Sequence, residues 1–180
     1  MRRRASSSGA AASELYAPDF AGPSPAWHSQ PMRRHAALLA TSFRALLGHD
    51  LVPGAGDLLM SRPEAVAELL REAGVVVASH GAQPVPVFNY GNEAALRLWE
   101  LSWEQFTCME SRRSAESVLR EEREELLRRV ARHGYVDDYS GVRISSSGRR
   151  FRISDAIVWN VELDDQRVGQ AVVFDKVEPL

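Results

Sequence analysis

Six aromatic residues are the first group in this chain whose types suggest the binding of a small molecule. They are Phe88, Trp99, Trp103, Phe106, Phe151 and Trp159. Ligand pockets in proteins are mostly apolar and carry a few polar groups that orient the ligand. Asn89 and Tyr90, directly after Phe88, could supply such groups at the mouth of a pocket. Alternatively, the aromatic side chains fill an ordinary core and Asn89 serves a turn, so both interpretations stay open.

Asp155 is the acidic residue whose position most suggests chemistry. It is in register with the apolar residues on one side of a predicted strand, which are Phe151, Ile153, Ile157 and Trp159. A carboxylate on this expected buried side needs a partner, such as Arg112 or Arg143, or else a raised pKa. It could then contact a ligand or act as an acid/base group. A β-bulge that turns Asp155 outwards, or a structural ion pair, is the alternative.

Arginines gather in two segments of the chain and could bind an acidic ligand or partner. They are Arg112, Arg113, Arg143, Arg149, Arg150 and Arg152. If the predicted strands pair, several of them share one region of the sheet. The alternative is that they are solvated strand positions, which also discourage edge-to-edge aggregation.

Motifs for metal, phosphate or seryl chemistry do not occur in the sequence. Its His and Cys residues lack the spacing of a metal site, and there is no Gly-rich phosphate loop or G-x-S-x-G elbow. The single Cys108 excludes an intramolecular disulfide, and we expect it to be a small buried residue. His80 falls in a predicted loop and His133 at the end of a predicted helix. We therefore predict no metal.

Length and composition indicate one globular domain with a tail. The chain has 180 residues, of which 44% are hydrophobic and 26% charged, and a formal net charge of -2. This charge gives no electrostatic case for binding nucleic acid. No window approaches the roughly 18 apolar residues of a membrane span, and the N-terminus lacks the apolar core of a signal peptide. We expect a cytoplasmic protein with a flexible tail over residues 1–30 and a single domain over residues 31–180.

The periodicity of the sequence predicts the elements that position these residues. Helices are predicted at 35–47, 61–73, 94–99, 103–109 and 114–133. Strands are predicted at 75–79, 85–88, 142–145, 151–161 and 168–174. Ser61 with Glu64, and Ser102 with Gln105, stand at the spacing of a capping box. Asn92 is expected to cap the helix that carries Trp99.

The order of these elements indicates an α+β fold. Two strands, a helical excursion and a three-stranded meander make one five-stranded antiparallel sheet, preceded by N-terminal helices. The excursion helices are expected to pack on one face of this sheet. The layout resembles that of PAS domains, in which the second strand leads into an asparagine and a short alanine-bearing helix, as FNYGNEAA does at residues 88–95.

One PAS-related family, the MEKHLA domain, resembles the chain more closely. The matching segments are FNYGNEAALRLWELSWEQF, SRRSAE and GYVDDYSGVRISSSGRRFRISDAIVWN, within residues 31–176. The family occurs as small stand-alone bacterial proteins, the form that this chain resembles. It also forms the C-terminal region of plant class III homeodomain-leucine zipper transcription factors. The resemblance implies a sensory or regulatory role and transfers no catalytic residue.

The resemblance to PAS domains raises flavin and haem as cofactors, and we expect neither. The photoactive flavin-binding branch attacks its flavin with a cysteine in an Asn-Cys-Arg-Phe context, whereas Cys108 stands in Phe-Thr-Cys-Met-Glu. Haem-binding PAS domains use a histidine on the long helix. His133 is at the last residue of that helix, where it suits the helix dipole instead.

Three hypotheses for function follow. The first is a non-catalytic sensory or interaction module that binds a small ligand or a partner protein. It would dimerise through the helix at 35–47 or the sheet and signal to a separate output protein, without contacting nucleic acid or a membrane. The second is a small cone-shaped α+β enzyme that uses Asp155 with Tyr139 or His80 as acid and base. The third, a transcriptional co-regulator, rests on analogy with the plant proteins.

Overall fold

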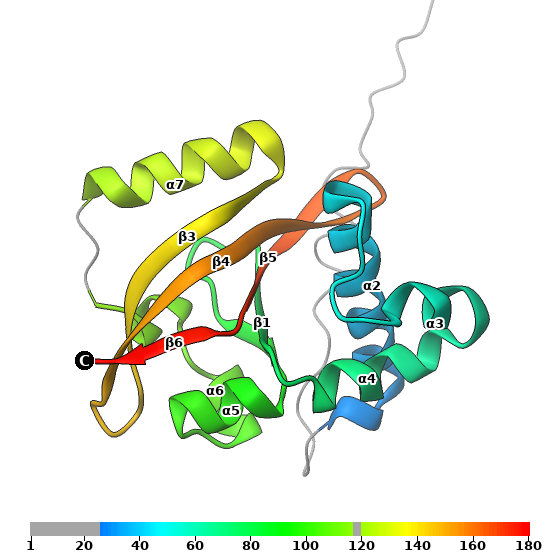
Figure 1. Ribbon diagram of the computed structural model, residues 1–180, viewed down its shortest axis with the longest axis horizontal. Coiled ribbons are helices and arrows are strands. Elements are labelled where there is room, and N and C mark those ends of the chain that lie inside the picture. The colour runs from blue at the N-terminus through cyan, green and yellow to red at the C-terminus, as the bar shows by residue number, and fades with distance from the viewer. Residues whose placement is uncertain (1–25, 117–119) are drawn as a thin grey trace, which may run out of the picture.

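The computed structural model describes residues 26–116 and 120–180, and most of the predicted tail lies outside this range. The chain forms an α+β fold around one antiparallel sheet (Figure 1). The strands are β1 (Val76–Gly81), β2 (Phe88–Gly91), β3 (Tyr135–Ile144), β4 (Arg150–Leu163), β5 (Gln166–Phe174) and β6 (Lys176–Pro179). The α-helices are α2 (Gln30–Leu47), α3 (Ala55–Ser61), α4 (Val66–Glu72), α5 (Glu93–Trp99), α6 (Trp103–Thr107) and α7 (Arg120–His133). Short 3-10 turns are η1 (Ala26–His28), η2 (Pro63–Ala65) and η3 (Ser111–Ser114).

The sheet has the strand order β2-β1-β5-β4-β3, and β6 pairs with β4 outside this path. The predicted two-stranded start and three-stranded meander are confirmed as antiparallel pairs. Strand β6 is a sixth strand that the sequence pattern did not reveal, because it is short and contains Pro179. It pairs with β4 from Phe151 to Ser154, next to the stretch of β4 that pairs with β5.

Helix α2 packs on the sheet through the apolar face that the sequence predicts. It begins earlier than predicted because Ser29 caps it, with the Ser29 hydroxyl accepting from the Met32 N–H at 3.3 Å. It ends at Gly48, which has a positive φ of 77°. Leu39 and Phe43 are buried in the core. The amphipathic pattern that suggested a dimer is therefore satisfied within the chain, and the homodimer stays a prediction.

The folded domain includes residues before the predicted boundary at 31. Trp27 is 7% exposed and meets the Trp103 ring edge-on, with 5.2 Å between centroids. Its indole Nε1 donates to the carbonyl of Gly91 at 3.2 Å. These contacts attach η1 to the end of β2 and to α6.

The predicted N-cap at Ser61 is wrong, because a helix ends there. The segment that was expected to be a turn forms α3, which opens at Gly54 with a positive φ of 85°. Ser61 is the last residue of α3, and its hydroxyl donates to the carbonyl of Asp57 at 2.7 Å, four residues back. Glu64 lies in the 3-10 turn that follows, without a side-chain cap. A serine hydroxyl can donate to a carbonyl inside a helix or accept from an N–H group at a helix start. The spacing of residues alone therefore does not distinguish a serine within a helix from an N-cap serine.

The two predicted caps in the excursion are confirmed. Asn92 is buried, and its Oδ1 accepts from the Ala95 N–H at 3.0 Å and from the Val77 N–H at 3.1 Å. Its amide nitrogen donates to the carbonyl of Val75 at 2.8 Å, so one side chain links α5 to the start of β1. Ser102 and Gln105 form the capping box of α6.

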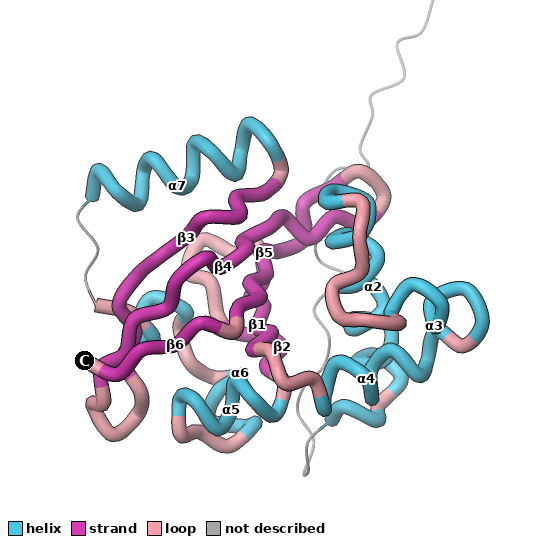
Figure 2. Tube along the Cα trace, in the orientation of Figure 1, coloured by secondary structure: helices cyan, strands magenta, loops and turns pink. Residues whose placement is uncertain are grey.

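Helix α7 ends at His133 as predicted but starts later than residue 114. Ser114 belongs to η3, residues 117–119 lie outside the described range, and α7 is described from Arg120. Gly134, with a positive φ of 78°, turns the chain from α7 into β3. Figures 1 and 2 show α7 beside β3, on the other side of the fold from α2.

A β-bulge at Asp155 changes which side chains of β4 point to each face of the sheet. Tyr139 pairs with Ala156 whereas Gly141 pairs with Ile153, so β4 holds more residues than β3 between the two pairs. Asp155 itself has a positive φ of 50°. The expectation that one side of β4 carries all its large apolar residues is therefore wrong, because the bulge reverses the alternation. Phe151 and Ile153 belong to one buried cluster, and Trp159 and Val161 to the other.

The sheet is thus covered on both faces, by different segments. On one face α2 and α4 pack over Val77, Trp159 and Ala171. On the other, α5 and α6 pack over the ends of β1, β4 and β5, where Trp99 meets Phe106 and Phe151. The excursion helices lie on one face as predicted. The opposite face is closed by the N-terminal helices.

Candidate functional site

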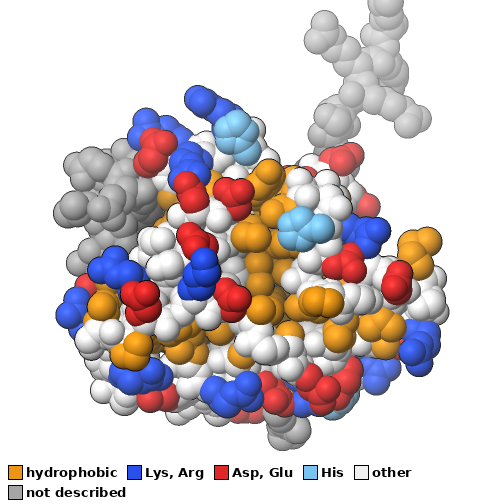
Figure 3. All heavy atoms as spheres, viewed as in Figure 1, with side chains coloured by type: hydrophobic (Ala, Val, Ile, Leu, Met, Phe, Trp, Pro, Cys, Tyr) orange, Lys and Arg blue, Asp and Glu red, His pale blue; other side chains and the backbone are white. Residues whose placement is uncertain are grey.

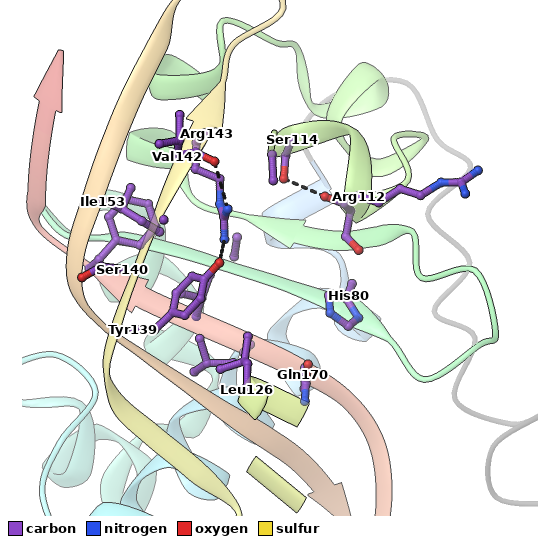
Figure 4. A pocket seen from close by; sticks show the side chains of 18 of the residues that line it. His80, Arg112, Ser114, Leu126, Tyr139, Ser140, Val142, Arg143, Ile153 and Gln170 are labelled. Carbon is purple, nitrogen blue, oxygen red and sulfur yellow. Dashed lines mark hydrogen bonds between the residues drawn. The ribbon is translucent and has the colours of Figure 1, made fainter. Parts of the chain in front are cut away.

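A large cavity lies over the face of the sheet that is opposite α2. Its volume is about 980 Å³. The floor is formed by β1, β3, β4 and β5, and the walls by η3 and α7 (Figure 4). Ligand sites in proteins span about 300–1,000 Å³, so this space can hold a small organic molecule.

The floor of the cavity is apolar in its centre. Val158 of β4 and Val172 of β5 pair across the sheet, and Ala78 of β1 pairs with Val172 on its other side. Residues that pair across antiparallel strands point to the same face, so these three side chains form a continuous surface. Leu126 of α7 lines the cavity from the opposite wall. A ligand bound here would bury apolar surface on two sides.

One end of the cavity is closed by the Trp99 cluster, which we define as that indole and the four aromatic rings packed around it. They are Phe88, Trp99, Phe106, Phe151 and Phe174. Ring centroids lie 4.4 Å apart for Phe88 and Phe106 and 5.7 Å apart for Trp99 and Phe151. All five side chains are buried. Four of the predicted pocket aromatics therefore come together, and Phe88 and Trp99 line the cavity itself.

Arg143 and Tyr139 supply the polar group of β3 inside the cavity. A guanidinium nitrogen of Arg143 donates to the Tyr139 hydroxyl at 2.9 Å, and another donates to the Val142 carbonyl at 3.2 Å. The guanidinium carbon lies 5.3 Å from the centroid of the Tyr139 ring. Gly141 lies between them, and a Cβ there would come within 2.8 Å of the Tyr139 hydroxyl. The glycine therefore leaves room for the pair.

His80, Gln170 and Asn160 form a second polar group, across β1, β5 and β4. Gln170 pairs with His80 on one side and with Asn160 on the other. Its amide donates to the side-chain oxygen of Asn160 at 3.3 Å. His80 Nδ1 lies 2.8 Å from the carbonyl of Gly81. The expected loop at His80 is wrong, since this residue belongs to β1 and lines the cavity together with Gln170.

Four predicted pocket residues lie on the opposite face of the sheet. They are Asn89, Tyr90, Trp103 and Trp159. The register of β1 and β2 slips at Asn89, so Tyr90 pairs with Ser79 and turns towards α2. There the Ser79 hydroxyl donates to Asn89 at 2.6 Å and lies 2.9 Å from His35 Nε2. Burial lowers the pKa of His35 to about 4 and raises that of Tyr90. These side chains belong to the core under α2.

Asp155 does not enter the cavity. Its side chain is 61% exposed and accepts from Lys176 Nζ of β6 at 2.5 Å. This hydrogen bond raises the pKa of Lys176. The expected buried position is therefore wrong, and the bulge and the ion pair are both present. Tyr139 and His80 line the cavity, whereas the Asp155 carboxylate does not. Asp155 therefore cannot act there with either residue as the enzyme hypothesis requires.

Three of the arginines predicted to cluster form ion pairs with separate acidic residues. Arg112 bonds to Glu110, Arg149 to Glu100 and Arg150 to Glu116. Figure 3 shows acidic and basic side chains interspersed over one face of the molecule. Arg113 and Arg152 are exposed, and neither lines the cavity. Of the six predicted arginines, Arg112 and Arg143 line it.

Cys108 is exposed, so the expectation of a small buried residue is wrong. It lies at a separate depression of about 400 Å³ with Met109 and Ile144. Within residues 26–116 and 120–180, no group of three His, Cys, Asp or Glu side chains could hold a metal ion. None of the helices described is both long and apolar enough to cross a membrane.

Residues that no sequence pattern singled out also line the cavity. Gln170 and Val172 alternate along β5, and Ser114 and Leu126 come from η3 and α7. Alternation in residues 168–174 is visible in the sequence, but which set faces the cavity depends on the register with β1 and β4. Only the assembled sheet settles that register.

The architecture is that of a PAS-type fold, and solved structures support this fold. A PAS domain of a protein from Colwellia psychrerythraea matches with a TM-score of 0.51 and 15% identity, over 69% of this chain and 98% of that one. A Rhodobacter sphaeroides LOV protein matches with a TM-score of 0.51 and 12% identity, over 63% of each chain. An RNA-binding light-oxygen-voltage receptor matches with a TM-score of 0.52 and 21% identity, over 72% of this chain and 34% of the receptor.

Within that class, the chain belongs to the MEKHLA domain family, whose model matches residues 33–179. The match includes the sheet, the excursion and most of α2. A comparison with curated proteins found no match.

Proposed function

We propose that the chain is a non-catalytic sensory module that binds a small molecule in the cavity between the sheet and α7. The observation that carries the proposal is the cavity of about 980 Å³ with its apolar floor and two polar groups. A concave site of that size, mostly apolar with a few converging polar groups, is typical of the places where proteins bind small molecules.

The structure also supports a route by which an occupied cavity changes the surface. Arg129 of α7 donates to Asp138 of β3 at 2.6 Å, and both residues line the cavity. A ligand that fills the space between α7 and β3 acts on this contact and on the position of α7. A separate output protein that reads α7 would then respond to binding, by differential affinity for the two states.

Flavin photochemistry does not fit the residues present. Two of the solved structures with this fold are named as light-oxygen-voltage proteins. In that branch a cysteine attacks the flavin, whereas no cysteine is among the residues described as lining this cavity. Cys108 is exposed at a different depression.

Native mass spectrometry and absorbance of the purified protein test the proposal. We expect a non-covalent compound that is released on denaturation and that Val172→Phe, which fills the cavity floor, excludes. Val85→Phe is the matched control, because Val85 is 48% exposed and outside the cavity. A bound compound that both variants retain equally would refute the proposal. The apo mass alone, together with no change in tryptophan fluorescence on addition of a metabolite extract, would also refute it.

A further inference from the structure

Among the residues that the structure describes, the arginines that line the cavity form ion pairs with acidic residues, with one exception. Four pairs are formed by the charged residues of the walls: Arg112 with Glu110, Arg128 with Glu125, Arg129 with Asp138 and Arg150 with Glu116. Arg143 is the remaining arginine among the described residues that line the cavity. Within the part of the chain that the structure describes, its guanidinium contacts the Tyr139 hydroxyl and the Val142 carbonyl and no carboxylate.

The position of Arg143 makes this charge significant. The residue is half-buried on β3 and faces the cavity. A guanidinium has five N–H groups, and two contacts leave donors for a ligand. Charge-assisted hydrogen bonds are roughly twice as strong as neutral ones, and they gain further where water is partly excluded.

Tyr139 adds a donor beside this cation. Its hydroxyl oxygen accepts from Arg143, which leaves its own proton for an acceptor in the cavity. Gly141, between the two, has no side chain to fill the space in front of them. Figure 4 shows Tyr139 and Arg143 directed towards one another, with His80 and Gln170 on strands across the cavity.

We propose that the cavity binds a small organic monocarboxylate, whose carboxylate pairs with Arg143 and accepts from the Tyr139 hydroxyl. The apolar body of the ligand would lie on Val158 and Val172 and extend towards the Trp99 cluster. Among the described residues, the other arginines that line the cavity have acidic partners, and the one positive charge left without a carboxylate matches a single carboxylate rather than a doubly charged phosphate. This inference rests on the proposed function, since it names the ligand class of the same cavity.

Amide NMR titrations with benzoate and with benzamide test the charge requirement directly. The two compounds have nearly the same shape, and both are far smaller than the cavity. We expect benzoate to shift the signals of residues around Tyr139 and Val172 and to bind about tenfold more tightly than benzamide. Arg143→Gln should reduce this ratio to about one, and Tyr139→Phe should reduce it by a smaller factor.

Two variants control for charge and for folding. Arg152→Gln removes an exposed arginine of β4 outside the cavity and should keep the tenfold preference. Arg143→Lys keeps the charge without the planar fork and should keep part of it. Each variant is first compared with the parent protein by its amide spectrum, so that a loss of fold is recognised.

The outcomes separate the two proposals. Equal binding of benzoate and benzamide at the cavity would overturn the carboxylate inference and leave the small-molecule sensor standing. A preference for benzoate that persists in Arg143→Gln would overturn the role of Arg143. No saturable shift with either compound, together with no co-purified ligand, would overturn both proposals.

Discussion

The indole Nε1 of Trp159 donates a hydrogen bond to the hydroxyl of Ser42 at 3.1 Å, which joins β4 to α2 across 117 positions of sequence. The Trp159 ring also meets Phe43 edge-on, with 5.0 Å between centroids. This tryptophan, a candidate for the pocket by its type, therefore holds the N-terminal helix to the back of the sheet. Both the ring packing and the hydrogen bond are buried, so each contributes to stability.

Replacement of Trp159 should affect stability and not the cavity. We expect Trp159→Phe to lower the free energy of unfolding by about 1–3 kcal/mol, because it removes the hydrogen bond and part of the buried ring. Urea unfolding measures this change. The benzoate affinity of the folded variant should equal that of the parent protein. A variant with parental stability and weakened benzoate binding would contradict the placement of Trp159.

Replacement of Asn92 should be among the more damaging polar changes. Asn92→Ala leaves the buried N–H groups of Val77 and Ala95 without their acceptor. We expect a loss of about 2–4 kcal/mol in urea unfolding. Asn92→Ser, whose hydroxyl can still cap α5, should recover about 1 kcal/mol of this. Equal stability of the alanine variant and the parent protein would show that these hydrogen bonds contribute nothing net.

His35 should make the stability depend on pH. Burial holds its pKa at about 4 in the folded chain, against an ordinary value of 6.5. Between these values the unfolded chain binds more protons than the folded chain, so stability is complete above pH 6.5 and falls as the pH decreases towards 4. The contribution of this residue to the fall is about 3 kcal/mol. His35→Gln should remove that part of the pH dependence, whereas His133→Gln, at an exposed helix end, should leave it unchanged.

The effect of a substitution at Asp155 on stability should depend on the backbone conformation that the new residue allows and not on its charge. Its positive φ of 50° is accessible to Asp and Gly and strained for β-branched residues. We therefore expect Asp155→Val to be less stable than Asp155→Gly by about 1–2 kcal/mol in thermal or urea unfolding. Asp155→Asn should be close to the parent protein in stability and in benzoate binding. A large loss of benzoate affinity in Asp155→Asn would restore a role for this carboxylate at the cavity.

The local signals of the sequence were sufficient for much of the architecture. Asn92 and the Ser102–Gln105 pair act within three residues of their partners, so composition and spacing were enough to place these caps. The same spacing failed at Ser61, because a helix that the pattern did not indicate already ended there. Strand β6 was missed for a related reason. It pairs with a stretch of β4, and the sequence of β6 does not indicate that this stretch is available for pairing.

The sequence by itself determined the α+β class, the order of β1 to β5 along the chain and four of the five members of the Trp99 cluster. Only the tertiary structure decided which side chains share the cavity. The bulge at Asp155 and the slip at Asn89 each insert one residue into a strand, and side chains alternate with a period of two. One extra residue therefore moved Trp159 and Tyr90 to the face under α2, while Arg143 and Tyr139 stayed on the face of the cavity.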